Sequence, residues 1–167
     1  MKYTSAQANK ILVGLNADRD ALLSKEQLGL EFTAATCENL DDARPPYDYA
    51  AVQAELAEIE AKIRKVKHAI NTFNVSHEIP EFNMTIDMAL VYIPQLTQRK
   101  NKLAGMRNRL AKMRCQNYDG SNLINYTYAN YDIEKADADY KAAAAELAKL
   151  QNALDLENST AEFEIDI

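Results

Sequence analysis

Apolar residues recur at alternating steps of three and four positions in three long stretches of the chain. The three rows, which include Arg99 as a single charged member, are Tyr49, Val52, Leu56, Ile59, Ile63, Val66, Ile70 and Phe73; Tyr92, Leu96, Arg99, Leu103, Met106, Leu110 and Met113; and Ile133, Ala136, Tyr140, Ala143, Leu147, Leu150 and Leu154. This period of 3.5 residues is typical of helices that pack along a seam. The pattern therefore predicts long helices that need partner helices.

Start and stop signals around these rows predict four helices. Their expected ranges are about 5–27, 48–73, 85–114 and 132–157. Thr4 or Ser5 can cap the first helix and Asp48 the second, because their side chains accept hydrogen bonds from backbone N–H groups that have no partner in the first turn. Pro94 falls inside the third helix, removes one backbone donor and predicts a kink or a restart there.

Two further segments resemble strands. Residues 123–129 are rich in Ile, Tyr and Thr, and residues 161–167 alternate apolar and acidic side chains as a half-buried strand does. We expect these two segments to pair with each other, while residues 30–36 give only a weak strand pattern. The predicted fold is mainly α, an antiparallel bundle of long helices or coiled-coil hairpins with a small antiparallel β element. The length favours a single helical domain over residues 1–167.

Residues 99–114 contain seven basic residues and no acid. Such a block can indicate a nucleic-acid or membrane surface, but most of its charges flank the predicted seam, where charges select a partner helix. The fourth helix carries acids at its own flanking positions. The residues that we assign to helix–helix assembly are Arg99, Lys100, Arg107, Arg109 and Arg114 on one side and Asp132, Asp137, Asp139 and Glu146 on the other. Pairing within one chain or between identical subunits is favoured over nucleic-acid binding.

Composition and charge limit the other partners. The chain has 167 residues and a formal net charge of −6, which does not favour nucleic acid or an anionic membrane. Its longest uncharged apolar run, residues 88–98, is too short for a bilayer core of about 30 Å. Residues 1–20 do not resemble an export signal, and Cys37 and Cys115 are too far apart for a metal knuckle. We therefore expect a cytoplasmic protein with two free thiols and no transmembrane segment.

Candidate chemistry is sparse. His68 and His77 have no ligand at metal spacing, and the sequence has neither a glycine-rich phosphate loop nor a nucleophile elbow. The sequence predicts no metal, no cofactor and no enzymatic activity. The most polar aromatic patch is the cluster Tyr118, Tyr126, Tyr128 and Tyr131. Its rings are expected to cover the helices with their hydroxyls at the rim, and the alternative is a small-ligand site shared with the acids of residues 132–139.

Three stretches resemble a known family: Lys67-His-Ala-Ile-Asn-Thr-Phe-Asn-Val75, Ala89-Leu-Val-Tyr-Ile-Pro-Gln-Leu96 and Asn125-Tyr-Thr-Tyr-Ala-Asn-Tyr-Asp-Ile-Glu134. They are similar to the septicolysin-like family of small bacterial proteins of unknown function. The resemblance implies a bacterial, mainly helical, self-associating protein. It supplies no catalytic residues.

These observations favour an uncharacterised bacterial helical protein that forms a homo-oligomer and has a structural, scaffolding or binding role. The first alternative is a membrane-acting protein, which the cytolysin in the family name suggests. The second is a small-ligand binder or enzyme that uses the Tyr-rich segment. The sequence does not name a small-molecule ligand.

Overall fold

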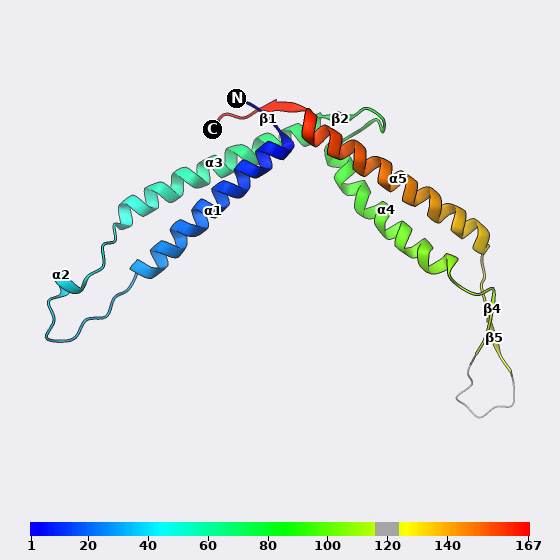
Figure 1. Ribbon diagram of the computed structural model, residues 1–167, viewed down its shortest axis with the longest axis horizontal. Coiled ribbons are helices and arrows are strands. Elements are labelled where there is room, and N and C mark those ends of the chain that lie inside the picture. Colours follow the sequence, from blue (N-terminus) through cyan, green and yellow to red (C-terminus); the bar gives the residue numbers. More distant parts are fainter. Residues whose placement is uncertain (116–123) are drawn as a thin grey trace. The chain divides into compact units, whose positions relative to one another are not determined.

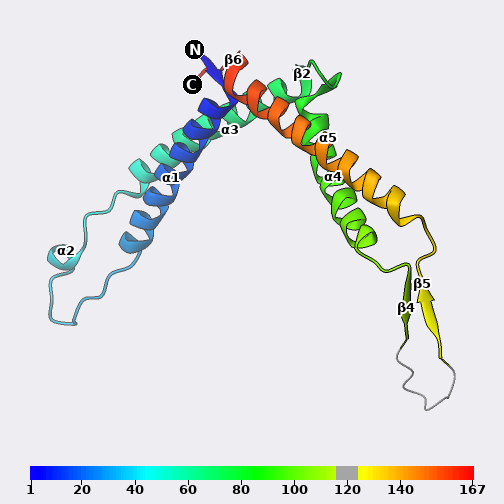
Figure 2. The same cartoon turned by 45° about the vertical axis from the view of Figure 1, so that its right-hand side comes forward.

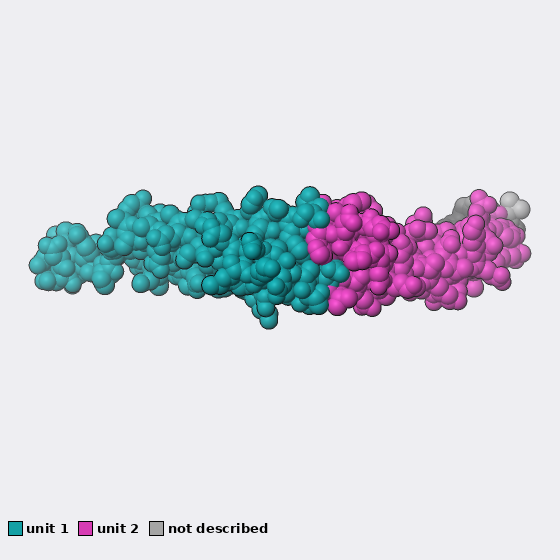
Figure 3. All heavy atoms as spheres, turned by 90° about the horizontal axis from the view of Figure 1, so that it is seen from above, with its two compact units in different colours: residues 1–76, 157–167 teal, residues 77–156 magenta. Residues whose placement is uncertain are grey.

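The computed structural model describes residues 1–115 and 124–167, which group into two compact units. Unit 1 comprises residues 1–76 and 157–167, and unit 2 comprises residues 77–156 (Figure 3). The chain is mainly α-helical with short antiparallel strand pairs, so the predicted fold class is confirmed. The single domain expected over residues 1–167 stays a prediction, which cooperative unfolding of the whole chain would test.

Unit 1 is built on two helices that lie side by side, α1 (Ser5–Gly29) and α3 (Tyr49–Ser76) (Figure 1). Thr4 caps α1 in a reciprocal capping box with Gln7, as the sequence predicted for Thr4 or Ser5. Asp48 caps α3, because its carboxylate accepts the Ala51 N–H at 3.1 Å. The connection contains only one helical turn, α2 (Leu40–Ala43), and no strand forms over residues 30–36.

The core of unit 1 lies near both chain termini. Strand β1 (Lys2–Thr4) pairs antiparallel with β6 (Glu162–Glu164), and the following Ile165 is buried against Ala8 and Val66. Phe163 stacks on Phe73 of α3 with ring centroids 4.5 Å apart. The predicted row of α3 is confirmed as the packed face, with buried members Leu56, Ile63, Val66 and Phe73. Its first member, Tyr49, is exposed.

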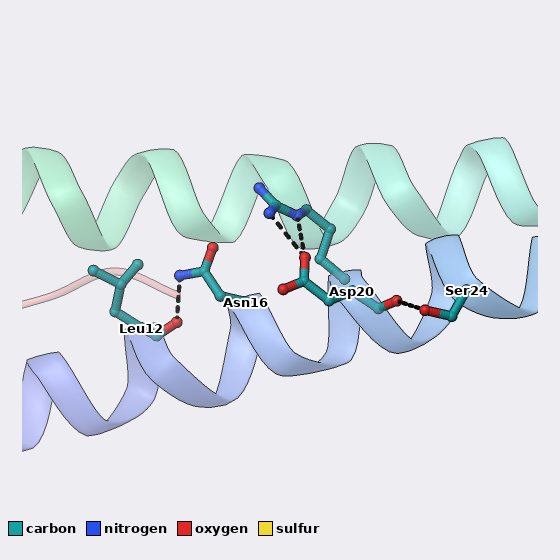
Figure 4. Close-up of polar contacts among 5 residues, drawn as sticks. Leu12, Asn16, Asp20 and Ser24 are labelled. Atoms are coloured by element: carbon teal, nitrogen blue, oxygen red, sulfur yellow. Dashed lines mark hydrogen bonds and ion pairs between the residues drawn. The ribbon is translucent and has the colours of Figure 1, made fainter.

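Farther along α1 several polar side chains bond to their own helix, while Glu26 near its end accepts a 2.8 Å hydrogen bond from the side chain of Gln53 on α3. Asn16 donates to the Leu12 carbonyl at 2.8 Å, Arg19 lies 2.9 Å from the Asp20 carboxylate, and Ser24 donates to the Asp20 carbonyl (Figure 4). Only Ser5 and Ala8 of α1 are buried. Because polar side chains satisfied locally add little to packing, α1 is held to α3 by its first turns, by half-buried Leu and Ile side chains and by the hydrogen bond between Gln53 and Glu26.

Unit 2 begins with a hairpin of β2 (Glu78–Ile79) and β3 (Met84–Thr85), and Thr85 caps the following helix α4 (Ile86–Arg107). Helix α4 runs across Pro94 without interruption, so the helix does not restart there. Helix α5 (Ile133–Thr160) lies beside α4 and ends in unit 1. The buried apolar residues of the two helices are Ile86, Ala89, Leu96 and Leu103 on α4 and Ala136, Ala143, Leu147, Leu150 and Leu154 on α5.

The third helix is shorter than predicted. It ends at Arg107 rather than Arg114, and Asn108 caps it with φ −89° and ψ 1°. Residues 112–114 form strand β4 (Lys112–Arg114) instead, and Leu110 and Met113 are exposed. Gly105 and Asn108 are both weak helix formers, so the helix has little intrinsic support beyond this point.

The predicted pairing of residues 123–129 with 161–167 is wrong. Strand β5 (Tyr126–Tyr128) pairs antiparallel with β4 in unit 2 (Figure 2), whereas β6 pairs with β1 in unit 1. Once the helix ends at Arg107, β4 and β5 are close in sequence, and closing a short loop costs less entropy than a long one. Both segments do form strands, but each has a different partner. Residue 123, the first of the predicted strand, lies outside the described residues.

Candidate interaction surfaces

The predicted contact between the basic end of α4 and the acidic start of α5 is present at one position. An Arg107 guanidinium nitrogen lies 3.1 Å from the Asp137 carboxylate, and the guanidinium carbon lies 4.2 Å from the centre of the Tyr140 ring. Asp137 also pairs with Lys141 at 2.6 Å, one turn farther along α5. The hydrogen bond from Lys141, the charge of Lys141 and the charge of Arg107 lower the pKa of Asp137. Arg107 therefore joins the two helices by charge and by stacking.

The other predicted assembly residues are not joined in this way. Lys100 is half-buried, while Arg99, Arg109 and Arg114 are exposed, and no ion pair among the described residues links them to the acids of α5. Arg99 thus lies outside the seam in which the heptad register placed it. The members of the predicted second row that lie on α4 are buried or half-buried except for Arg99, and Lys100 takes its place on that face. The buried and half-buried members are Tyr92, Leu96, Leu103 and Met106. A role for the exposed residues in assembly stays a prediction.

The acids of α5 have three different surroundings. Asp132 caps the helix by accepting the Lys135 N–H at 3.1 Å, and Asp139 is half-buried. Glu146 accepts a hydrogen bond of 2.7 Å from the hydroxyl of Tyr92 on α4. That bond, desolvation and the negative charge of Glu146 raise the pKa of Tyr92, because each of them disfavours the phenolate. The Tyr92–Glu146 and Arg107–Asp137 contacts together show that α4 and α5 are antiparallel.

An apolar groove of about 660 Å³ lies beside the Tyr92–Glu146 bond. Its lining residues are Glu81, Phe82, Met84, Asp87, Met88, Val91, Tyr92, Gln95 and Glu146. Met88 and Val91 are 57% and 58% exposed, which is high for large apolar side chains on a helix. This surface was not predicted, because the apolar pattern indicated one packed row on this helix. The available signal was the pair Met88 and Val91, three positions apart on α4 and preceded by Met84 of β3.

The β4–β5 hairpin presents a second surface. All six strand residues are exposed, and the ammonium of Lys112 lies 4.0 Å from the ring centre of Tyr126 and 5.5 Å from that of Tyr128. The exposed rings of Tyr126 and Tyr128 thus lie beside Lys112 and do not cover the helices as predicted. Tyr131 donates a 2.7 Å hydrogen bond to the Met106 carbonyl, and Tyr118 lies outside the described residues.

A groove of about 540 Å³ lies on this hairpin and the end of α4. Its lining residues are Asn108, Arg109, Leu110, Met113, Thr127, Tyr128 and Ala129. A two-stranded ribbon is only marginally stable in water unless other groups cover it. The exposed apolar side chains of this ribbon therefore form a surface suited to a partner.

The described part of the chain contains no group of three or more His, Cys, Asp or Glu residues placed to hold a metal ion. This includes the acids of residues 132–139, which the sequence analysis named as part of a possible ligand site. Among the same residues, no helix combines the length and apolarity needed to cross a bilayer.

Comparison with known proteins yields the fold alone. No family model matches the chain, and no curated protein matches it. A solved structure described as a functionally unknown conserved protein from Corynebacterium diphtheriae is similar, with a TM-score of 0.58 and 19% sequence identity. The similarity covers 98% of this chain and 100% of that one. A bacterial protein of known structure therefore has a similar fold along its whole chain.

Proposed function

We propose that this protein is a self-assembling structural or scaffolding protein of the bacterial cytoplasm, with copies that associate through surfaces left uncovered by its paired helices. The observation that carries the proposal is the apolar groove on α4. Met88 and Val91 lie on the outer face of a helix whose inner face already packs toward α5. A helix with two apolar rows needs a partner on each side. The resemblance to the septicolysin-like family, which implies self-association, supports the same function.

The free energy gained by covering the groove is smaller than the cost of association. Burying a large apolar side chain completely contributes about 1.5–3 kcal/mol, and Met88 and Val91 are already partly covered. Association costs about 4–15 kcal/mol in lost translational and rotational freedom. The groove alone is therefore too small for a stable complex, and a second contact surface is required.

The mass of the protein in solution tests the proposal. We expect sedimentation velocity at micromolar concentration to give a dimer or larger species for the wild-type chain. Val91→Glu places a charge in the groove and should shift the distribution toward monomer. Asn152→Glu is the matched control, because it adds the same charge at an exposed position of α5 in the same unit that neither lines the groove nor lies in the basic block of residues 99–114. A wild-type chain that is strictly monomeric would contradict the proposal.

A further inference from the structure

Charges of opposite sign are concentrated in two segments that belong to different units. Residues 99–114, the basic segment, carry seven bases and no acid, a formal charge of +7. Residues 31–60, the acidic segment, carry eight acids and the single base Arg44, a formal charge of −7. The basic segment covers the second half of α4 and strand β4, and the acidic segment covers α2 and the first three turns of α3. The formal charges of the two segments are therefore equal in magnitude and opposite in sign.

These charges are available to a partner. All eight acids of the acidic segment are exposed; they are Glu31, Glu38, Asp41, Asp42, Asp48, Glu55, Glu58 and Glu60. No ion pair among the described residues involves any of them. In the basic segment, Arg107 is paired with Asp137, and no acid among the described residues pairs with the other six bases. Facing surfaces of opposite sign steer association and fix its register.

Each segment also exposes apolar side chains. In the acidic segment Phe32, Leu40 and Tyr49 are 39%, 57% and 66% exposed. In the basic segment Leu110 and Met113 are 68% and 56% exposed, and both line the groove on the hairpin. Stable interfaces combine an apolar centre with a polar or charged rim. Both segments have this composition.

We infer that the acidic segment of one copy docks on the basic segment and the β4–β5 hairpin of a second copy. This inference rests on the proposed self-assembly and supplies the second contact surface that the groove on α4 requires. Apolar side chains of the acidic segment enter the groove lined by Leu110 and Met113, while the carboxylates face Arg109, Lys112 and Arg114. The contact joins two different surfaces, so copies linked by it can close as a dimer or ring or continue as a filament.

A second copy fits the basic segment better than a nucleic acid does. Nucleic acid would use the bases alone and would leave the acidic segment unmatched. The chain as a whole carries −6, which repels a polyanion at longer range. The apolar groove beside the bases also has no use in contacts to phosphates. Binding of the basic segment to single-stranded DNA is therefore an outcome that the experiment must include.

Charge reversal in both segments tests the inference. One variant combines Glu38→Lys, Asp41→Lys and Asp42→Lys, and the other combines Arg109→Glu, Lys112→Glu and Arg114→Glu. All six residues are exposed, and we expect both variants to keep the helical circular dichroism of the wild type. Each variant alone should associate at least about tenfold more weakly, because the reversed segment keeps a formal charge of only −1 or +1 and like charges face each other at the reversed positions. An equimolar mixture of the two should recover a heteromer through its one attractive contact, which also shows that both variants fold.

Matched controls separate this result from a general charge effect. The control variant Lys10→Glu, Lys67→Glu and Lys149→Glu reverses three exposed bases outside the basic segment and should associate as the wild type does. Association of the wild type should weaken toward about 1 M NaCl, where the Debye length is only about 3 Å. If the wild type assembles and both reversed variants assemble equally well, the inference is overturned while the proposed function stands. A monomeric wild type overturns both, and wild-type binding of single-stranded DNA in preference to self-association overturns the inference.

Discussion

Arg107 of α4 lies 3.1 Å from the Asp137 carboxylate and 4.2 Å from the centre of the Tyr140 ring, both on α5. The same side chain thus contacts two successive turns of the neighbouring helix. Both partners of the ion pair are about one-third exposed, so solvent screens the charge contact. The planar guanidinium adds stacking, which an ammonium group does not provide in the same geometry.

Replacing Arg107 should therefore weaken unit 2. We expect Arg107→Ala to destabilise the protein by about 1 kcal/mol, since cation–π contacts and partly exposed ion pairs each contribute roughly 0.5–1 kcal/mol. Arg107→Lys keeps the charge and should lose only part of this. Urea unfolding followed by circular dichroism measures both. An equal loss of unfolding free energy in the two variants would show that stacking on Tyr140 contributes more than the charge of Arg107.

The acid dependence of the unfolding free energy should include a contribution from the protonation of Asp137. The hydrogen bond from Lys141 and the charges of Lys141 and Arg107 hold its pKa below the ordinary value of 3.8. A carboxyl with a lowered pKa in the folded state stabilises the protein above its unfolded pKa. This stabilisation is lost as the pH falls below about 4 through the folded pKa. Asp137→Asn should therefore flatten the acid limb of the stability curve, whereas Asp155→Asn, an exposed control on the same helix, should not.

The sequence predicted α3 and α5 well because their apolar rows are long and regular. The rows beginning at Tyr49 and Ile133 are buried or half-buried except for Tyr49 itself. The row beginning at Tyr92 was less informative, since α4 carries a second apolar row and ends at Arg107. Short strands such as β4 have no periodicity long enough to be recognised, and their partners depend on tertiary context. The groove on α4 depends on which of two rows faces α5, and periodicity alone does not decide that.

Core and surface leucines of unit 2 should differ clearly in their effect on stability. Leu150 is completely buried, so Leu150→Ala should cost about 2–5 kcal/mol through lost burial and the resulting cavity. Leu110 is 68% exposed, and Leu110→Ala should change stability by no more than about 0.5 kcal/mol. Denaturant unfolding under conditions that keep the protein monomeric measures both. A large loss of monomer stability in Leu110→Ala would mean that Leu110 is packed within its own chain.

Tyr92 should be recognisable in an alkaline titration. Its hydrogen bond to Glu146 raises the pKa of its phenol above 10.0, so its phenolate should form later than an ordinary tyrosine's. A raised pKa in the folded state stabilises the protein below the unfolded pKa, and this stabilisation is lost as the pH rises above about 10. The difference in phenolate absorbance between the wild type and Tyr92→Phe isolates this group. Glu146→Gln should move the transition to lower pH, while Glu134→Gln, at an exposed position, should leave it unchanged.

The two cysteines provide a direct test of the docking between copies. Cys37 lies exposed in the acidic segment, and Cys115 is half-buried directly after β4, where its sulfur lies 3.0 Å from the Thr127 hydroxyl. Cys115→Ser leaves only the first thiol, and Cys37→Ser leaves only the second. The proposed docking brings Cys37 of one copy close to Cys115 of another. A bifunctional maleimide should therefore give a crosslinked dimer in the mixture of the two variants and little in either variant alone. The yield should fall at high salt, because screening weakens the contact between the charged segments. Efficient crosslinking of one variant with itself, with no additional dimer between the two variants in the mixture, would require like segments to meet and would contradict this docking.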